Sequence, residues 1–344
     1  MSAGSAAVIA KARSKYGKTL TLSDYKALMV KSDVNDIVTA LKAYPDFKAE
    51  LSSISDTAVR RGQAEEMMNK RLFRIYMDLC RFKFGKKGGF YYYLVKQEEA
   101  KQIISAAMYI SADAYETFIL SFPVFLTEYC SFDIMALTKA RSFGEMLIAL
   151  KGTPYYDILK ALPADGGRFP QIRSIERALG MYYQTWLLDT VKKEFSGSER
   201  TEIERCILRG CDIYNLKLCY RLKGLFKLSN DEVMSCRIPY HYRFSEKNML
   251  ELLEKEDSEQ ILPLILRHPY FKSCRDIDGI DFETAVKKAN QRFFSEKLRL
   301  SQYDSVVMYS LMELLAIENA NLTTVIEGVR YSLASEEIEK MLTI

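Results

Sequence analysis

Residues 33–47 read DVNDIVTALKAYPDF, and this fifteen-residue pattern occurs three times in the chain. The other copies are SFGEMLIALKGTPYY at 142–156 and DSEQILPLILRHPYF at 257–271. Each copy has a capping residue, apolar residues at helical spacing, a proline, and an aromatic residue two positions after the proline. Three copies of one unit are more typical of a shaped scaffold than of an enzyme with a single pocket.

Each copy is predicted to form a short helix that the proline ends. Asp33, Ser142 and Asp257 are good N-cap residues, because their side-chain oxygens can accept hydrogen bonds from the first free backbone N–H groups. A proline disfavours the helical conformation at the residue before it, so the helix should stop there. Pro263 lies inside the third copy and is expected to kink its helix.

Two sets of apolar residues accompany the three copies. The aromatic residues after the prolines, which are expected to fold back as plugs, are Phe47, Tyr156 and Phe271. The leucines that stand seventeen residues before the prolines are Leu28, Leu137 and Leu252. This constant placement indicates that the repeated unit extends beyond the fifteen residues.

A second recurrent signature, acidic–x–x–amide–aliphatic, lies later in each unit. Its copies are Glu99–Gln102–Ile103, Asp212–Asn215–Leu216 and Glu318–Asn321–Leu322. They fall 57, 61 and 52 residues after the preceding copy's proline. One interpretation is a buried polar contact between units. The simpler one, which we favour, is an amide that satisfies a neighbouring turn of helix and fixes the helix register within a unit.

The length of 344 residues exceeds the size at which one hydrophobic core usually keeps growing. The three prolines are 109 and 115 residues apart, which predicts three helical repeats at 1–115, 116–235 and 236–344. Apolar residues at helical spacing run through the chain, with almost no two-residue alternation, so the predicted fold class is all-α. Examples of such helical stripes are Met68–Leu72–Ile75–Leu79–Phe82, Ile172–Ile175–Leu179–Tyr182–Trp186 and Phe282–Val286–Ala289–Phe293.

Composition excludes several classes of function. The net charge is only +4 with 27% charged residues, which argues against wholesale binding to a nucleic-acid backbone. No stretch reaches the ~18 apolar residues that a membrane-spanning helix needs, and residues 1–8 lack the pattern of a signal peptide. Seven scattered cysteines suggest reduced, buried thiols of a cytoplasmic protein rather than disulfides or a zinc site.

Three motifs suggest chemistry but are incomplete. Residues 17–19, Gly–Lys–Thr, lack the glycine five residues earlier that a phosphate-binding loop requires. Residues 276–281 resemble a calcium loop but have Asp281 where glycine is needed, so a turn ending in an N-cap is expected. His241 and His268 have no evident catalytic partner, and His268 is expected at the surface end of a helix. We therefore assign no catalytic, cofactor-binding or metal-ligating residue.

The chain resembles the C subunit of the archaeal-type and prokaryotic V-type ATPases, whose eukaryotic relative is the d subunit. The run AKARSKYGKTL at 10–20, followed by Asp24–Tyr25 and Leu28, is similar to the start of that family. Residues 214–217, YNLK, resemble its middle signature. Residues 318–322, ENANL, followed by 326–328 and 336–338, resemble its C-terminal signature.

This resemblance implies a funnel of three similar helical units around a pseudo-threefold axis. It implies a non-catalytic rotor subunit, without bound nucleotide or cofactor, that couples the central stalk to the membrane rotor ring for ion transport or ATP synthesis. The expected partners are the central-stalk subunits and the proteolipid ring, and the expected location is the cytoplasmic face of the membrane. We expect apolar or basic loop residues at the ring-facing end and a more polar cavity at the stalk-facing end.

Two other classes of protein remain open from the sequence. One is a generic helical-repeat adaptor that binds proteins away from any membrane complex. The other is an all-α metal-dependent enzyme, which would require Glu99, Asp212 and Glu318 to converge on one cavity with a bound metal. The resemblance favours the rotor subunit over both.

Overall fold

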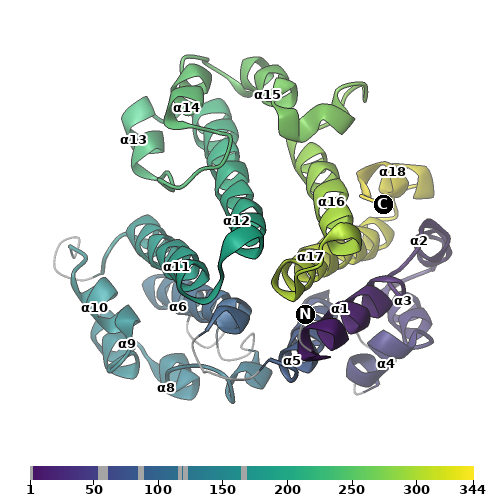
Figure 1. Ribbon diagram of the computed structural model, residues 1–344, viewed down its shortest axis with the longest axis horizontal. Coiled ribbons are helices and arrows are strands. Elements are labelled where there is room, and N and C mark those ends of the chain that lie inside the picture. The colour runs from purple at the N-terminus through teal and green to yellow at the C-terminus, as the bar shows by residue number, and fades with distance from the viewer. Residues whose placement is uncertain (1–2, 53–60, 84–88, 115–117, 119–122, 164–168) are drawn as a thin grey trace. The chain divides into compact units, whose positions relative to one another are not determined.

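The computed structural model describes residues 3–52, 61–83, 89–114, 118, 123–163 and 169–344. These residues form helices joined by turns, which confirms the predicted all-α class (Figure 1). The chain divides into two compact units, one formed by Met1–Phe84 with Thr201–Ile344 and the other by Gly85–Arg200. The three repeats at 1–115, 116–235 and 236–344, and their threefold arrangement as a funnel, stay a prediction; the boundary at 115–116 lies outside the described residues.

The helices of the first unit come from both ends of the chain. They are α1 (Ala3–Tyr16), α2 (Leu22–Met29), α3 (Val34–Leu41), α4 (Pro45–Leu51), α5 (Arg61–Cys80), α12 (Gly197–Leu218, which begins just before the unit does), η3 (Cys219–Leu225), α13 (Asn230–Ser235), α14 (Glu246–Leu253), α15 (Ser258–Arg267), η4 (Pro269–Cys274), α16 (Phe282–Leu300), α17 (Asp304–Arg330) and α18 (Ser335–Met341). Those of the second unit are η1 (Phe90–Tyr92), α6 (Tyr93–Ser111), η2 (Val124–Leu126), α8 (Ile134–Lys139), α9 (Phe143–Ala149), α10 (Pro154–Lys160) and α11 (Ile172–Glu194).

The three predicted N-caps are confirmed. Asp33 accepts from the Asp36 backbone N–H at 2.9 Å, which starts α3. Ser142 caps α9 in the same way at 3.2 Å, and Asp257 caps α15 through the N–H of Gln260 at 2.9 Å. Each cap satisfies a backbone donor that the helix itself cannot satisfy. A hydrogen bond between neighbouring residues therefore marks the start of the helix in each of the three copies.

Each of the three prolines begins a helix, but the predicted stop at the residue before the proline fits only the third copy. There α15 ends at Arg267, whereas α3 already ends at Leu41 and α9 at Ala149. Pro45, Pro154 and Pro269 each occupy the first position of a following helix, where a missing N–H costs nothing. The residue before each proline has an extended conformation, as predicted. Pro263 does not break α15, which continues to Arg267.

The apolar positions of the repeat are buried, with one correction. Phe47 and Phe271 are the predicted plugs, and both are almost completely buried. In the middle copy Tyr155 takes the buried place, while the predicted Tyr156 is only half-buried. The three leucines before the prolines are also buried, on α2, α8 and α14: Leu28, Leu137 and Leu252.

The long helix α17 is the centre of the first unit. It packs against α16, α1 and α5, and 19 of its 27 residues are buried. A helix covered on so many sides is apolar nearly all round. The polar residues that it buries, among them Glu318 and Asn321, therefore need partners from the surrounding elements.

The helices that carry the acidic signatures all end in the same left-handed turn. In α6 the Ala114 N–H donates to the Tyr109 carbonyl at 2.8 Å, and in α17 the Leu333 N–H donates to the Gly328 carbonyl at 2.9 Å. This six-to-one hydrogen bond is the Schellman pattern, which places the residue before its donor at positive φ. Among the described residues, the non-glycine residues with positive φ are these turn residues: Asp113, Lys227 and Ser332.

The end of α12 differs by one inserted residue. Asp113 and Ser332 each lie 14 residues after the acidic residue of their helix, whereas Lys227 lies 15 residues after Asp212. The segment η3 that continues α12 is a π-helix, in which each backbone hydrogen bond spans one more residue than in an α-helix. The π-helix thus absorbs the insertion and preserves the turn at Lys227.

Within the described residues, no helix has both the length and the apolar character needed to cross a membrane. The seven cysteines are free thiols, and all except the half-buried Cys130 are buried. Burial raises the pKa of Cys206, Cys211 and Cys219 to about 12 each, so these thiols stay protonated. Their burial agrees with the prediction that they pack as small apolar residues.

Candidate functional site

Each acidic signature binds the loop that precedes a triplet of short helices. The triplets are α2–α4, α8–α10 and α14–η4, and their loops contact the signature residues of α17, α6 and α12, respectively. We name these contacts the Glu318, Glu99 and Asp212 junctions after their acidic residues. All three carboxylates accept backbone N–H groups, so each one fixes the start of a triplet against a long helix.

In the Glu318 junction the carboxylate has a cationic partner from another helix. Its Oε1 accepts the Leu20 N–H at 2.8 Å, and its Oε2 accepts from Arg71 of α5 at 2.6 Å. The Arg71 and Glu318 side chains are both buried, and the Arg71 guanidinium lies 3.8 Å from the ring centre of Phe47. A buried charge is tolerated when it is paired and hydrogen-bonded, as it is here.

In the Asp212 junction the carboxylate is satisfied without a cation. Its two oxygens accept the N–H groups of Tyr242 at 3.0 Å and Arg243 at 2.7 Å, and Oδ2 also accepts from the Tyr270 hydroxyl. Burial, together with the hydrogen bond to Asp212, raises the pKa of Tyr270, so the hydroxyl remains a donor. Arg209 lies three residues before Asp212 but does not bond to its carboxylate.

In the Glu99 junction the cation comes from the same helix. Glu99 accepts from the Ser131 N–H, from the Tyr155 hydroxyl at 2.7 Å and from Lys96 at 3.0 Å. Burial and the neighbouring carboxylate raise the pKa of Tyr155, which keeps that hydroxyl protonated. Tyr155, which takes the buried place predicted for Tyr156, is therefore the residue whose hydroxyl binds Glu99.

The amides of two signatures bind backbone in pairs of hydrogen bonds. Asn321 donates to the Thr343 carbonyl at 2.6 Å and accepts the Thr343 N–H at 3.0 Å. Asn215 does the same with Ile238, at 2.8 and 2.9 Å. These amides bind backbone outside the helices rather than a neighbouring turn of helix. The interpretation favoured from the sequence therefore named the wrong hydrogen-bond partner for the amides. Gln102 is half-buried and forms no such pair with described residues.

Contacts also correct the assignment of each signature to the preceding proline. Glu99 binds Tyr155, which follows Pro154, and Asp212 binds Tyr270, which follows Pro269. Glu318 binds Leu20, ahead of the first triplet. A signature therefore belongs with the triplet after it, and the last signature belongs with the first triplet.

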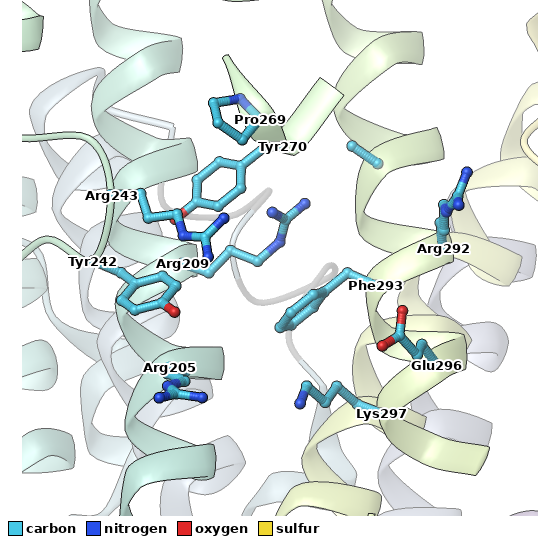
Figure 2. A pocket seen from close by; sticks show the side chains of 11 residues that line it. Arg205, Arg209, Tyr242, Arg243, Pro269, Tyr270, Arg292, Phe293, Glu296 and Lys297 are labelled. Atoms are coloured by element: carbon cyan, nitrogen blue, oxygen red, sulfur yellow. The ribbon is translucent and has the colours of Figure 1, made fainter. Parts of the chain in front are cut away.

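A basic pocket of about 290 Å³ adjoins the Asp212 junction between α12 and α16 (Figure 2). Aromatic side chains form part of its wall: Tyr242, Tyr270 and Phe293. Charged side chains form most of the remainder: Arg205, Arg209, Arg243, Arg292, Lys297 and Glu296. This is the described cavity in which cationic side chains most outnumber carboxylates, so it is the clearest candidate for a ligand site.

The guanidinium of Arg209 lies at the centre of this pocket. It reaches from α12 to 4.2 Å from the ring centre of Tyr270 and 4.6 Å from that of Phe293 (Figure 2). Its Nη2 donates to Asn290 at 3.1 Å, whereas its Nε is buried without a hydrogen-bond partner. Burial lowers the pKa of Arg209 to about 10, and the side chain remains charged at neutral pH.

The other motifs take up local structural roles. Asp281 is an N-cap, as predicted, and accepts the Thr284 N–H at 3.0 Å to start α16. Gly17 follows the end of α1, consistent with the predicted helix before it. His268 joins α15 to η4, as expected for a helix end, but it is half-buried rather than fully exposed. In the described part of the chain no group of three or more His, Cys, Asp or Glu residues is placed to hold a metal ion.

We did not identify Arg71, Arg209 or the basic pocket from the sequence. One signal was present: Lys96 and Arg209 each stand three residues before the acidic residue, on the same helical face. Arg205 and Arg209 are also four residues apart on α12, which places them on one face. The sequence held no comparable signal that α12 and α16 lie close enough to form a pocket.

The sequence is similar to one family of known proteins over nearly its whole length. A family model described as ATP synthase (C/AC39) subunit matches residues 8–341. The C subunit of the A-type ATP synthase of Methanosphaera stadtmanae is 24% identical over 345 residues, 97% of this chain and 86% of that protein. The same subunits of Methanococcoides burtonii and Archaeoglobus fulgidus are 27% and 26% identical, over 61% and 62% of this chain and 58% and 60% of their own lengths. The family match includes Glu99, Asp212 and Glu318.

Proposed function

The chain belongs to the ATP synthase (C/AC39) subunit family, and from that premise we propose that it couples the central stalk of a rotary ATPase to the membrane rotor ring. The match over residues 8–341 is the observation that carries this proposal. It also confirms the resemblance seen at 10–20, 214–217 and 318–322. The family is that of an accessory subunit of the ATP synthase rather than of a catalytic one.

The junctions support a coupling role, because a part that transmits torque has to resist twisting. In the Asp212 junction the acid and the amide both bind backbone of the segment before α14. In the Glu318 junction the acid binds the backbone before α2, and the amide binds that of Thr343 after α18. Buried polar networks of this kind hold elements in one register, since every alternative leaves polar groups unsatisfied. A rigid coupler fits these contacts better than a flexible adaptor does.

The left-handed turns after α12–η3 and α17 are our candidates for contact with the rotor ring. The first turn exposes Leu225 and Phe226 next to Lys227, and the second exposes Tyr331 and Leu333 next to Arg330. Exposed aromatic and basic side chains of this kind are typical of binding surfaces. We therefore assign these turns to the ring-facing end, for which apolar or basic loop residues are expected.

The decisive experiment compares the complete ATPase complex with one that lacks this subunit. We expect the depleted complex to hydrolyse ATP while ATP-driven ion uptake into vesicles falls to background. Adding the purified chain back should restore ion uptake per ATP hydrolysed. Full ion uptake in the depleted complex would contradict the coupling role. Recovery of the chain from cells only with proteins unrelated to the ATPase would favour the adaptor.

Substitutions in the turns test the proposed contacts. Phe226→Ser and Tyr331→Ser should weaken rebinding to the depleted complex, each by about tenfold, as for aromatic residues at interface centres. Leu300→Ser is the control, because Leu300 is similarly exposed but ends α16, next to the start of α17 and about 40 Å from Tyr331 at the other end of that helix. Equal losses for the three variants would contradict the assignment.

A further inference from the structure

The basic pocket between α12 and α16 holds more positive charge than its surroundings neutralise. Lys297 is paired with Glu202 at 2.8 Å. Within the described residues, by contrast, no carboxylate lies within 4.0 Å of a guanidinium nitrogen of the pocket's arginines, which are Arg205, Arg209, Arg243 and Arg292. The pocket's own carboxylate, Glu296, is exposed and makes no ion pair with them.

The pocket has a buried floor and an exposed rim. Arg209 is only 3% exposed, and its Nε lacks a hydrogen-bond partner. Arg205, Arg243 and Arg292 are exposed and lie on different sides of Arg209 among the lining residues (Figure 2). Burying a guanidinium without a carboxylate is costly, and a bound anion would remove that cost. An unpartnered buried donor at the base of a ring of cations therefore points to an anionic ligand.

The arrangement fits a phosphoryl group better than a single carboxylate. A carboxylate offers two oxygens and one negative charge, whereas a phosphoryl group offers three oxygens and up to two negative charges to several guanidinium forks. The volume of about 290 Å³ exceeds what a phosphoryl group alone would fill. The rings of Tyr242, Tyr270 and Phe293 can line the space for the attached group.

We propose that this pocket binds the phosphoryl group of a small phosphorylated molecule, with Arg209 at its floor and Arg205, Arg243 and Arg292 at its rim. This role goes beyond coupling and does not depend on it, because α12 and α16 form the pocket within one compact unit. The Glu318 junction offers no equivalent site, since its buried Arg71 is neutralised by Glu318.

The test is a titration of the full chain with inorganic pyrophosphate by isothermal calorimetry, at constant ionic strength set with chloride. We expect saturable one-to-one binding. Arg292→Ala should weaken it about tenfold, the usual effect of losing one charge-assisted hydrogen bond. Arg299→Ala removes the same charge from the same helix outside the pocket and should change the affinity less than about twofold, through screened long-range charge alone.

Glu296→Gln is expected to change the affinity for pyrophosphate in the opposite direction. Removing the pocket's carboxylate should tighten pyrophosphate binding several-fold, which a merely structural role of Glu296 would not do. Arg209→Met should abolish binding, and circular dichroism checks that this variant folds. Because Arg292 and Glu296 are exposed, their variants keep the test valid even if Arg209→Met does not fold.

Sedimentation with phosphatidylcholine vesicles, with and without phosphatidic acid, distinguishes the two sources of a phosphoryl group. Binding to phosphatidic acid that Arg292→Ala weakens and pyrophosphate displaces would identify a lipid headgroup as the source. Binding of pyrophosphate alone would identify a soluble ligand. The proposal is overturned if pyrophosphate does not saturate, if Arg292→Ala and Arg299→Ala behave alike, or if an acidic peptide binds the pocket and pyrophosphate does not compete.

Discussion

Glu318 and Asp212 occupy the same position in two copies of the acidic signature, yet their negative charges are balanced in different ways. Glu318 is neutralised by Arg71, which comes from α5. Asp212 relies on two backbone N–H groups and a tyrosine hydroxyl, and the arginine beside it, Arg209, turns to a pocket of other cations. The backbone geometry of a repeat can therefore be retained while the location of its positive charge changes.

The position three residues before the acid explains the difference. It holds Lys96 and Arg209 in two copies but Leu315 in the third. Leu315 is buried on α17, which is covered on several sides and has no room for a cation of its own at that point. Arg71 on the adjacent α5 supplies the charge instead. The Asp212 copy keeps its arginine but does not use it for the acid, and that leaves Arg209 available to a ligand.

The largest expected effect separates the two arginines. Arg71→Met should destabilise the protein by about 3–5 kcal/mol, because it leaves the buried Glu318 carboxylate without its counter-charge. Arg209→Met should change stability by less than about 1 kcal/mol, because Asp212 keeps all its hydrogen bonds and a desolvated cation is removed. Chemical denaturation measures the free energy of unfolding of both variants, and its dependence on denaturant concentration is compared between them.

A double-mutant cycle checks the cause of the Arg71 effect. Adding Glu318→Gln to Arg71→Met should recover part of the lost stability, since glutamine can still accept the Leu20 N–H and carries no charge. Additive losses would contradict the charge explanation. Equal losses for Arg71→Met and Arg209→Met would remove the distinction between the two junctions.

The next effect concerns the amides, which the two junctions use alike. Asn321→Leu and Asn215→Leu should each cost about 2–4 kcal/mol, because each leaves a buried backbone N–H and carbonyl without a partner. Gln102→Leu is the matched control and should cost less than about 0.5 kcal/mol, as a substitution without such a pair does. A loss at Gln102 as large as at Asn321 would show that the amide acts by packing rather than by hydrogen bonding.

A smaller effect concerns close approaches at the ends of the long helices. A Cβ at Gly328 would lie 2.5 Å from the Ile338 side chain, and one at Gly224 would lie 3.0 Å from the Ser258 backbone. Alanine at either position should destabilise by about 1–3 kcal/mol through overpacking. Gly210→Ala, in the middle of α12 with nothing near its Cβ, should instead stabilise by about 0.5–1 kcal/mol. Thermal unfolding of the three variants, monitored by circular dichroism, tests the sign at each position.

Features that depend on neighbouring residues could be predicted from the sequence. The caps at Asp33, Ser142 and Asp257 and the extended residue before each of the three prolines need only a few consecutive residues. The burial of Phe47 and Phe271 follows from the same pattern. Tyr155 shows the limit: two tyrosines follow Pro154, and only the packed structure decides that the first one reaches Glu99.

Long-range pairings could not be predicted in the same way. Leu20 and Glu318 are 298 residues apart in the chain, and Arg71 and Glu318 are 247 apart. Order along the chain suggested that each signature belongs to the preceding triplet, whereas the contacts join the last signature to the first triplet. The basic pocket could not be predicted for the same reason, because Arg209 and Arg292 come from helices that only the fold places face to face.

The smallest expected effect is a pH dependence confined to the Asp212 junction. His268 stands just before Pro269, where the first triplet has Tyr44. Burial lowers the pKa of His268, and the positive charges of Arg209 and Arg243 lower it further. The contact between Nε2 and the Arg243 carbonyl at 3.4 Å and the nearby Asp212 charge oppose this shift without reversing it. The folded state thus binds a proton less readily than the unfolded state, whose histidine titrates near pH 6.5.

Stability should therefore be complete above that pH and decline as the pH falls from about 7 through 6.5 to the lower folded pKa. His268→Tyr introduces the residue of the first triplet and should remove this decline. The measurement is the unfolding temperature at pH 7.5 and pH 5.5, a window in which most carboxylates stay charged. His241→Gln is the control, because that exposed histidine lies outside the junction's contacts. If wild type and His268→Tyr lose the same stability between these pH values, His268 does not distinguish the Asp212 junction from the Glu318 junction.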